Sequence, residues 1–271
     1  MAQWSALLLN VGVWEGSFTR LSPTGRVESD LPSVVSLESL NGDKTMRQTI
    51  RTGQGDDLNE RVLEYSSLSR SVRFFDTGAF SQGSLQLGPS STFGAELGFI
   101  HGDRRLRLVQ LFDKGAQLTQ LTLIREQRQG IDLSPEPGLM VDDLVGTWQG
   151  EATTEYADLR SPDRYPTKLR LTRQGQTLTQ SLELPSRTLT SQAQISDPTL
   201  RFGDGEDAVQ VLLLPGGASS TTPLSLPKRK AFFLEAGWLI SPTLRQRMIR
   251  RYDDSGAWES LTLVVEQKQP G

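Results

Sequence analysis

The segment Gly-Val-Trp-Glu-Gly-Ser-Phe at residues 12–18 decides the fold, because its Gly-x-Trp-x-Gly frame returns as Gly-Thr-Trp-Gln-Gly at residues 146–150. Glycine lets the backbone bend sharply and pass close to a neighbouring strand. An indole ring is large enough to fill one end of a closed sheet. We therefore interpret Trp14 and Trp148 as structural plugs of two β-barrels.

The repeat continues toward the end of each half of the chain. Glu-Leu-Gly-Phe-Ile at residues 96–100 returns as Glu-Ala-Gly-Trp-Leu at residues 235–239. Further equivalent pairs follow in the same order: Arg107 and Arg247, Phe112 and Tyr252, Leu118 and Trp258, and Glu126 and Glu266. Matches that keep their order over most of a chain indicate that one β unit has been duplicated.

Short apolar runs alternate with turn signals about every 8–12 residues, which is typical of antiparallel sandwiches and barrels. The sequence thus predicts an all-β protein of two tandem antiparallel barrels of the lipocalin-like, or calycin, type. The N-terminal barrel is expected in residues 1–130 and the C-terminal barrel in residues 139–271. Proline and glycine near residues 129–139 stop strand pairing and predict a linker there.

Two segments depart from the strand rhythm. Residues 3–11 carry apolar side chains at helical spacing, which predicts a short helix. It would serve as a lid over a barrel end or, alternatively, as an amphipathic membrane anchor. Residues 214–223 are rich in glycine and serine and are expected to form a mobile loop, either a tolerated insertion or a partner-binding loop.

The composition excludes several classes of function. A net charge of −3, with 36% hydrophobic and 23% charged residues, describes a globular protein without the basic character of nucleic-acid or membrane-surface binders. The chain has no cysteine and a single histidine, so thiol catalysis and thiolate metal sites are excluded and a histidine relay is not expected. We expect no catalytic residues, no metal and no cofactor, and read Glu96 and Glu235 as structural.

No early apolar run is long enough for a membrane span, and the start lacks the features of a secretion signal. The expected location is therefore a cytoplasmic-type compartment. The expected state is a monomer.

The last hairpin of each half carries the main candidate for ligand binding. Aligned strand on strand, Leu106, Leu108, Gln110 and Phe112 correspond to Gln246, Met248, Arg250 and Tyr252. If this face points inward, the lumen of the second barrel contains Arg250 and Tyr252 beside Met248. Arg-x-Tyr there resembles the carboxylate clamp of intracellular fatty-acid-binding proteins. A buried arginine needs a carboxylate partner, either from the protein or from a ligand. The second case predicts an amphipathic ligand such as a fatty acid, bilin or other tetrapyrrole.

In the alternative register Arg250 lies in water. A basic outer stripe would then dock an acidic protein surface or would simply be solvated. The residues of this predicted stripe are Lys228, Arg229, Lys230, Arg245 and Arg247.

Three segments, at residues 10–25, 32–38 and 47–50, carry a family resemblance. The first reads Asn-x-Gly-x-Trp-x-Gly-Ser-Phe-x-Arg-x-Ser-Pro-x-Gly, the second Pro-Ser-Val-Val-Ser-Leu-Glu and the third Arg-Gln-Thr-Ile. Together they resemble the two-barrel calycin-type family of cyanobacteria and chloroplasts, which includes a biogenesis factor of the chloroplast ATP synthase.

The resemblance implies a non-enzymatic, chaperone-type assembly factor that binds F1 subunits of ATP synthase, in the cyanobacterial cytoplasm or an equivalent stroma. The more distant phycobilin lyases are similar too. They imply bilin lyase chemistry as a third possibility, ranked below the ligand carrier.

Overall fold

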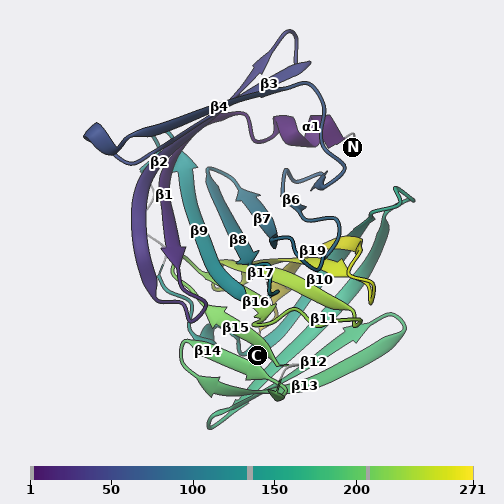
Figure 1. Ribbon diagram of the computed structural model, residues 1–271. Helices are drawn as coiled ribbons and strands as arrows, with labels where there is room; N and C mark the ends of the chain where they lie inside the picture. Colours follow the sequence, from purple (N-terminus) through teal and green to yellow (C-terminus); the bar gives the residue numbers. More distant parts are fainter. Residues whose placement is uncertain (1–2, 133–136, 206–207, 271) are drawn as a thin grey trace. The chain divides into compact units, whose positions relative to one another are not determined.

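The computed structural model describes residues 3–132, 137–205 and 208–270. Within them the named elements are β-strands, helices α1 (Gln3–Leu8) and α2 (Val141–Leu144), and the 3-10 turn η1 (Gly55–Asp57). The strands form one curled nine-stranded sheet and one closed ten-stranded barrel (Figure 1). The predicted fold class, all-β with two tandem antiparallel barrel units and a short N-terminal helix, is confirmed.

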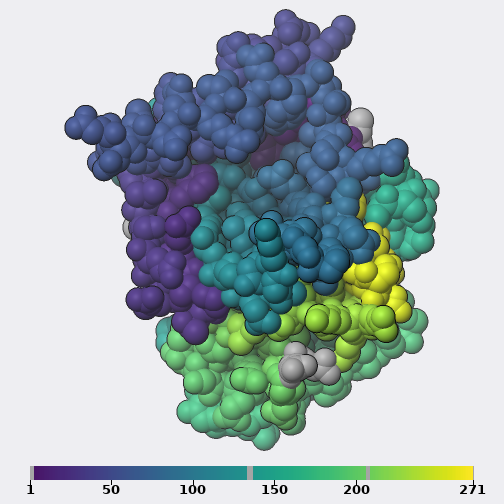
Figure 2. Space-filling model, viewed as in Figure 1, coloured from purple at the N-terminus to yellow at the C-terminus, as the bar shows by residue number. Residues whose placement is uncertain are grey.

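The first sheet runs in the order β4-β3-β2-β1-β9-β8-β7-β6-β5. Its strands are β1 (Gly12–Leu21), β2 (Val27–Leu40), β3 (Thr45–Thr52), β4 (Asn59–Tyr65), β5 (Val72–Phe74), β6 (Phe80–Gly83), β7 (Phe93–His101), β8 (Arg104–Phe112) and β9 (Leu118–Arg128). The β3–β4 hairpin, in blue, stands out at the surface (Figure 2). Met46 is the one buried residue of these two strands, and Arg47 and Glu64 form an ion pair there.

The second sheet closes, because β10 pairs with both β11 and β19. Its strands are β10 (Gly146–Tyr156), β11 (Asp163–Gln174), β12 (Thr177–Leu184), β13 (Arg187–Ser196), β14 (Thr199–Phe202), β15 (Val209–Leu213), β16 (Ala218–Pro223), β17 (Phe232–Ser241), β18 (Leu244–Tyr252) and β19 (Trp258–Lys268). Each strand is hydrogen-bonded to its neighbours in sequence, so the barrel is a simple up-and-down meander.

The glycines of the repeated frame have two separate roles. The first one, Gly12 or Gly146, has φ of 132° or 133°, a backbone conformation that side-chain-bearing residues rarely adopt. The second glycine, Gly16 or Gly150, lies against the last strand of its unit, β9 or β19. A Cβ on Gly16 would lie 1.9 Å from the Arg125 carbonyl oxygen, and Gly150 is equally confined. The frame therefore needs glycine at both positions.

Each repeated tryptophan lies in its own apolar core, next to the short helix that precedes it. The first core contains Ala6, Leu7, Trp14, Val35, Leu37, Met46 and Phe74. The second contains Leu139, Val141, Leu144, Trp148, Leu169, Leu171, Leu178, Ala193, Ile195, Leu200 and Leu213. The predicted N-terminal helix is present as α1 and contributes Ala6 and Leu7 to the first core.

The prediction of a mobile loop at residues 214–223 is wrong. Most of this segment is β16, which pairs with β15 and β17 inside the closed barrel. Gly216 and Gly217, both with positive φ, form the preceding turn. Ser220 and Thr222 are each only 1% exposed, so their side chains are packed against the rest of the protein. Small residues here reflect tight packing and not mobility.

The described residues form two compact units that do not follow the chain order. The first comprises segments of residues 1–83, 94–111 and 120–134, and the second comprises segments of residues 84–93, 112–119 and 135–271. The predicted linker near residues 129–139 includes residues 133–136, which lie outside the described part. Two segments that precede this linker belong to the second unit.

Candidate functional site

The two repeated tryptophans occupy equivalent buried sites. Trp14 and Trp148 are both fully buried. The indole nitrogen of Trp14 donates to the carbonyl oxygen of Asn10 at 2.9 Å, and that of Trp148 donates to Leu144 at 2.9 Å. In both halves the acceptor lies four residues before the tryptophan. The duplication thus extends from the sequence to single hydrogen bonds.

Cations lie against both indole rings. The guanidinium carbon atoms of Arg105 and Arg128 lie 4.6 and 4.3 Å from the centroid of Trp14. Arg245 lies 4.5 Å, and the Lys268 ammonium 5.4 Å, from the centroid of Trp148. At these distances the negative face of the ring attracts a cation, most strongly where water is excluded.

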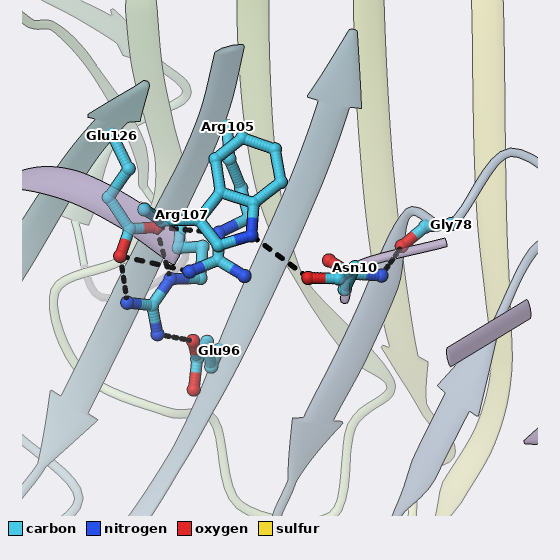
Figure 3. A network of polar contacts seen from close by, with 7 residues as sticks. Asn10, Gly78, Glu96, Arg105, Arg107 and Glu126 are labelled. Carbon is cyan, nitrogen blue, oxygen red and sulfur yellow. Dashed lines mark hydrogen bonds and ion pairs between the residues drawn. The ribbon is translucent and has the colours of Figure 1, made fainter. Parts of the chain in front are cut away.

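In the first unit these cations continue into a buried ion network (Figure 3). Arg105 and Arg107 lie on one face of β8, two residues apart, and both donate to Glu126 on β9. The Nε–Oε2 distance from Arg105 is 2.7 Å and the Nη2–Oε1 distance from Arg107 is 2.9 Å. Arg107 also contacts Glu96 on β7 at 2.8 Å. The network joins three neighbouring strands.

The second unit repeats this network with Arg245, Arg247, Glu266 and Glu235. Arg245 donates to Glu266 at 2.6 Å, and Arg247 contacts Glu266 at 2.9 Å and Glu235 at 3.4 Å. The side chains of Arg245 and Arg247 are only 6% and 13% exposed. Their predicted exposure on an outer stripe is therefore wrong, because each arginine turns inward to satisfy Glu266.

The charges of the network determine its protonation. Burial opposes ionisation of Glu126, but Arg107 and Arg105 outweigh that penalty and lower its pKa to about 2. The pKa of Glu266 is lowered in the same way, against the opposing effect of burial. Burial disfavours the charged form of Arg107, but Glu126 and Glu96 outweigh it and raise the pKa. Glu126, Glu266 and Arg107 are therefore charged at neutral pH, whereas burial raises the pKa of Glu235 against the opposing effect of Arg247.

Acid should destabilise the first unit through Glu126. Its pKa falls from an ordinary 4.5 to about 2 on folding, so its contribution is complete above about pH 4.5 and is lost as the pH falls toward 2. The shift corresponds to about 3 kcal/mol in the free energy of unfolding. Urea unfolding midpoints measured by circular dichroism from pH 7 to 2 should show the decline. A Glu126→Gln variant should lose this part of the pH dependence, and an identical profile would contradict the assignment.

The face of β18 that carries the predicted clamp points away from the barrel interior, because the pairing register puts Arg245, and not Arg250, on the same side of the sheet as Trp148. Met248, Arg250 and Tyr252 are all fully buried. The prediction that Arg250 and Tyr252 face the lumen is therefore wrong, and the alternative in which Arg250 lies in water is wrong too, because Arg250 is fully buried. Their cross-strand neighbours on β17, Ala236, Leu234 and Phe232, are buried as well. A polar pair thus lies in a buried, mainly apolar layer on the outer side of these barrel strands.

The clamp residues contact the chain itself. The Nε of Arg250 donates to the hydroxyl of Tyr252 at 2.9 Å, and the guanidinium lies 4.1 Å from the centroid of Trp258. The Tyr252 hydroxyl donates to the carbonyl oxygen of Ser84 at 3.0 Å, and Nη2 of Arg250 lies 3.4 Å from the same oxygen. Burial raises the pKa of Tyr252, and Arg250 opposes this shift. A backbone carbonyl occupies a position where a ligand carboxylate oxygen could bind.

Residues 84–87 run along the turn between β18 and β19. Trp258 donates its backbone N–H to Leu85 at 2.8 Å, and Leu87 donates to Gly256 at 2.9 Å. The side chain of Gln86 donates to the Ser255 carbonyl at 2.7 Å. Sequence reasoning missed this segment, because contacts between residues about 170 positions apart leave no periodic signal.

The remaining predicted docking residues lie together on the turn before β17. Lys228, Arg229 and Lys230 are all exposed. Arg229 has φ of 55°, in the left-handed region that is uncommon for residues other than glycine. The structure thus separates this exposed basic turn from the buried Arg245 and Arg247.

Two other kinds of site were tested on the described residues. Among residues 3–132, 137–205 and 208–270, no group of three or more histidine, cysteine or acidic side chains could hold a metal ion. No helix in that part of the chain is long and apolar enough to cross a membrane.

Each of the two β units contains a buried tryptophan next to a buried ion network, and the two networks are equivalent. This arrangement defines a tandem-repeat protein of the two-barrel class. The chain belongs to the DUF3598 family. Residues 1–131 match the model for the N-terminal domain of unknown function DUF3598, and residues 135–269 match the model for the C-terminal domain of biogenesis factor required for ATP synthase 1. The family resemblance seen in the sequence is confirmed.

One similar solved structure is that of a DUF3598 family member of unknown function from Nostoc punctiforme PCC 73102. It is 47% identical, with a TM-score of 0.94 over 99% of this chain and 100% of that chain. An S-type phycobiliprotein lyase from Guillardia theta is 9% identical, with a TM-score of 0.21 over 100% of this chain and 94% of that chain. A mutant transferrin binding protein B from Haemophilus parasuis is also 9% identical, with a TM-score of 0.27 over 96% and 76%. The last two TM-scores are too low to carry any argument. No curated protein matches the chain.

Proposed function

We propose that the chain is a non-enzymatic assembly factor for the F1 part of ATP synthase and that it acts through protein–protein contacts. The observation that carries this proposal is the match of residues 135–269 to a domain of a biogenesis factor required for ATP synthase. The expected compartment is the cytoplasm or stroma, where F1 is assembled, and the expected free state is a monomer of calycin-type barrels.

Affinity purification from the native source tests this function. The tagged chain, isolated at low salt from cells that are assembling ATP synthase, should recover F1 subunits. It should recover fewer after protein synthesis has been blocked and assembly has finished. The tag alone is the control. Recovery of no F1 subunit from assembling cells would contradict the proposal.

A carrier function is the second candidate, and the burial of Arg250 beside Tyr252 favours it. Both side chains can donate hydrogen bonds to a carboxylate of a fatty acid, bilin or other tetrapyrrole. Such a ligand would have to replace the carbonyl oxygen of Ser84, which both residues now contact. An absorption spectrum and a lipid extract of the natively purified protein decide this point. A stoichiometric fatty acid or pigment would support the carrier, and bilin lyase chemistry ranks below it.

A further inference from the structure

A small pocket opens beside the basic turn of the second unit. It has a volume of about 150 Å³. Its walls are mainly apolar and are formed by Val209, Pro223, Pro227, Lys230, Ala231 and Phe232, with Phe233 beside them. A volume of this size accommodates a group about as large as a benzene ring. The pocket therefore suits one apolar side chain.

One wall of the pocket is held rigidly from behind. Phe232 is buried and stacks on Tyr252 with 4.9 Å between ring centroids. It also meets Phe93 edge-on at 5.7 Å. Aromatic pairs at these distances stabilise each other beyond the area that they bury. A wall fixed in this way is preformed, which lowers the cost of ordering when a ligand binds.

The rim of the pocket carries positive charge. Lys230 lines the pocket itself, and Lys228 and Arg229 precede it on the exposed turn. The left-handed backbone of Arg229 is strained for a residue with a side chain, and such conformations cluster at ligand-binding sites. Three consecutive cations attract an acidic partner and increase its rate of encounter.

We propose that this pocket docks an acidic segment of a partner protein, which inserts one aromatic or large aliphatic side chain beside Pro227 and Phe232. Its carboxylates contact Lys228, Arg229 and Lys230. This inference deepens the proposed function and rests on it only for the identity of the partner, an ATP synthase subunit. A fatty acid shares the same chemistry of an apolar group and an anion. However, sites that enclose a whole ligand typically span about 300–1,000 Å³, so the volume favours a single side chain.

Nuclear magnetic resonance titration of the full isotope-labelled chain tests the site. The probe is the capped peptide Asp-Glu-Phe-Glu-Asp. Shifts should concentrate on residues 223–233, and binding should weaken with salt. Replacing phenylalanine by alanine in the peptide, or both aspartates and both glutamates by their amides, should each weaken binding about tenfold. No saturable shift at millimolar peptide, or equal binding of all three peptides, overturns the proposal.

Variants of the chain locate the binding. Combining Lys228→Gln, Arg229→Asn and Lys230→Gln should weaken binding of the acidic peptide about tenfold, and asparagine tolerates the left-handed backbone. Ala231→Phe should fill the pocket and remove the preference for phenylalanine. The matched control combines Lys44→Gln, Arg61→Gln and Arg70→Gln, three exposed cations elsewhere. An equal effect of the two triple variants overturns the site.

Two further outcomes distinguish a failure of this proposed site from a failure of the proposed function. If the peptide binds as expected but no F1 subunit is purified, the site stands and the partner is a different acidic protein. If F1 subunits are purified equally well by the chain and by the Lys228/Arg229/Lys230 variant, the function stands and this site is overturned. Tighter binding of laurate than of the peptide, at the same residues, assigns the pocket to a fatty acid and also overturns the proposal.

Discussion

The change Glu126→Gln should lower the free energy of unfolding by about 3–5 kcal/mol. Glu126 is 5% exposed and accepts hydrogen bonds from Arg105 and Arg107. Glutamine keeps the size but not the charge, so two buried guanidinium groups lose the charge that compensates them. The carboxamide also places an N–H₂ group against these donors. Urea unfolding at pH 7, followed by circular dichroism, measures the loss.

The pair Arg47–Glu64 provides a matched control within the same sheet. Its side chains are 44% and 50% exposed and the ion pair is 2.7 Å long. Because water screens such a pair, Glu64→Gln should cost less than about 1 kcal/mol. Glu266→Gln should act like Glu126→Gln, since it carries the same role in the second network. Equal small effects for Glu64→Gln and Glu126→Gln would show that the buried charges do not stabilise the fold.

The change Arg250→Met should lower the free energy of unfolding by about 2–4 kcal/mol. Methionine fills most of the volume but removes the hydrogen bond to Tyr252 and the cation from the face of Trp258. It also removes a donor from Ser84, so residues 84–93 should open more readily. Hydrogen exchange and limited proteolysis of residues 84–93 measure that opening, separately from global unfolding.

The neighbouring Arg251 provides the control for this change. Its side chain is 49% exposed and its 3.6 Å ion pair with Glu259 lies at the surface. Arg251→Met should therefore change the free energy of unfolding by less than about 1 kcal/mol and leave exchange at residues 84–93 unaltered. If Arg250→Met leaves that segment as protected as Arg251→Met does, Arg250 does not hold it.

The features that the sequence predicted are those that repeat. Trp14 and Trp148 lie in equivalent buried positions with the same backbone acceptor, because each copy of the frame folds by local rules. The two alternating faces of β18 also followed from strand periodicity, but periodicity did not show which face points into the barrel.

The features that the sequence did not predict depend on long-range or unusual packing. Arginines are ordinarily exposed, so Arg245 and Arg247 looked like surface residues until Glu266 on the adjacent strand was seen to pair with both. The glycine- and serine-rich segment that includes β16 looked like a loop, because small polar residues are usual in loops. Composition alone cannot distinguish small residues that pack tightly in a strand from small residues in a flexible loop.

Residues 84–93 have a consequence for the two duplicated halves of this chain. They are encoded with the first repeat but are folded as part of the second compact unit. A gene fragment beginning at residue 139 would therefore encode a second repeat without Ser84 and Phe93, and with Tyr252 lacking two of its neighbours. The duplicated halves are therefore not interchangeable parts, since the second repeat draws Ser84 and Phe93 from a segment encoded within the first.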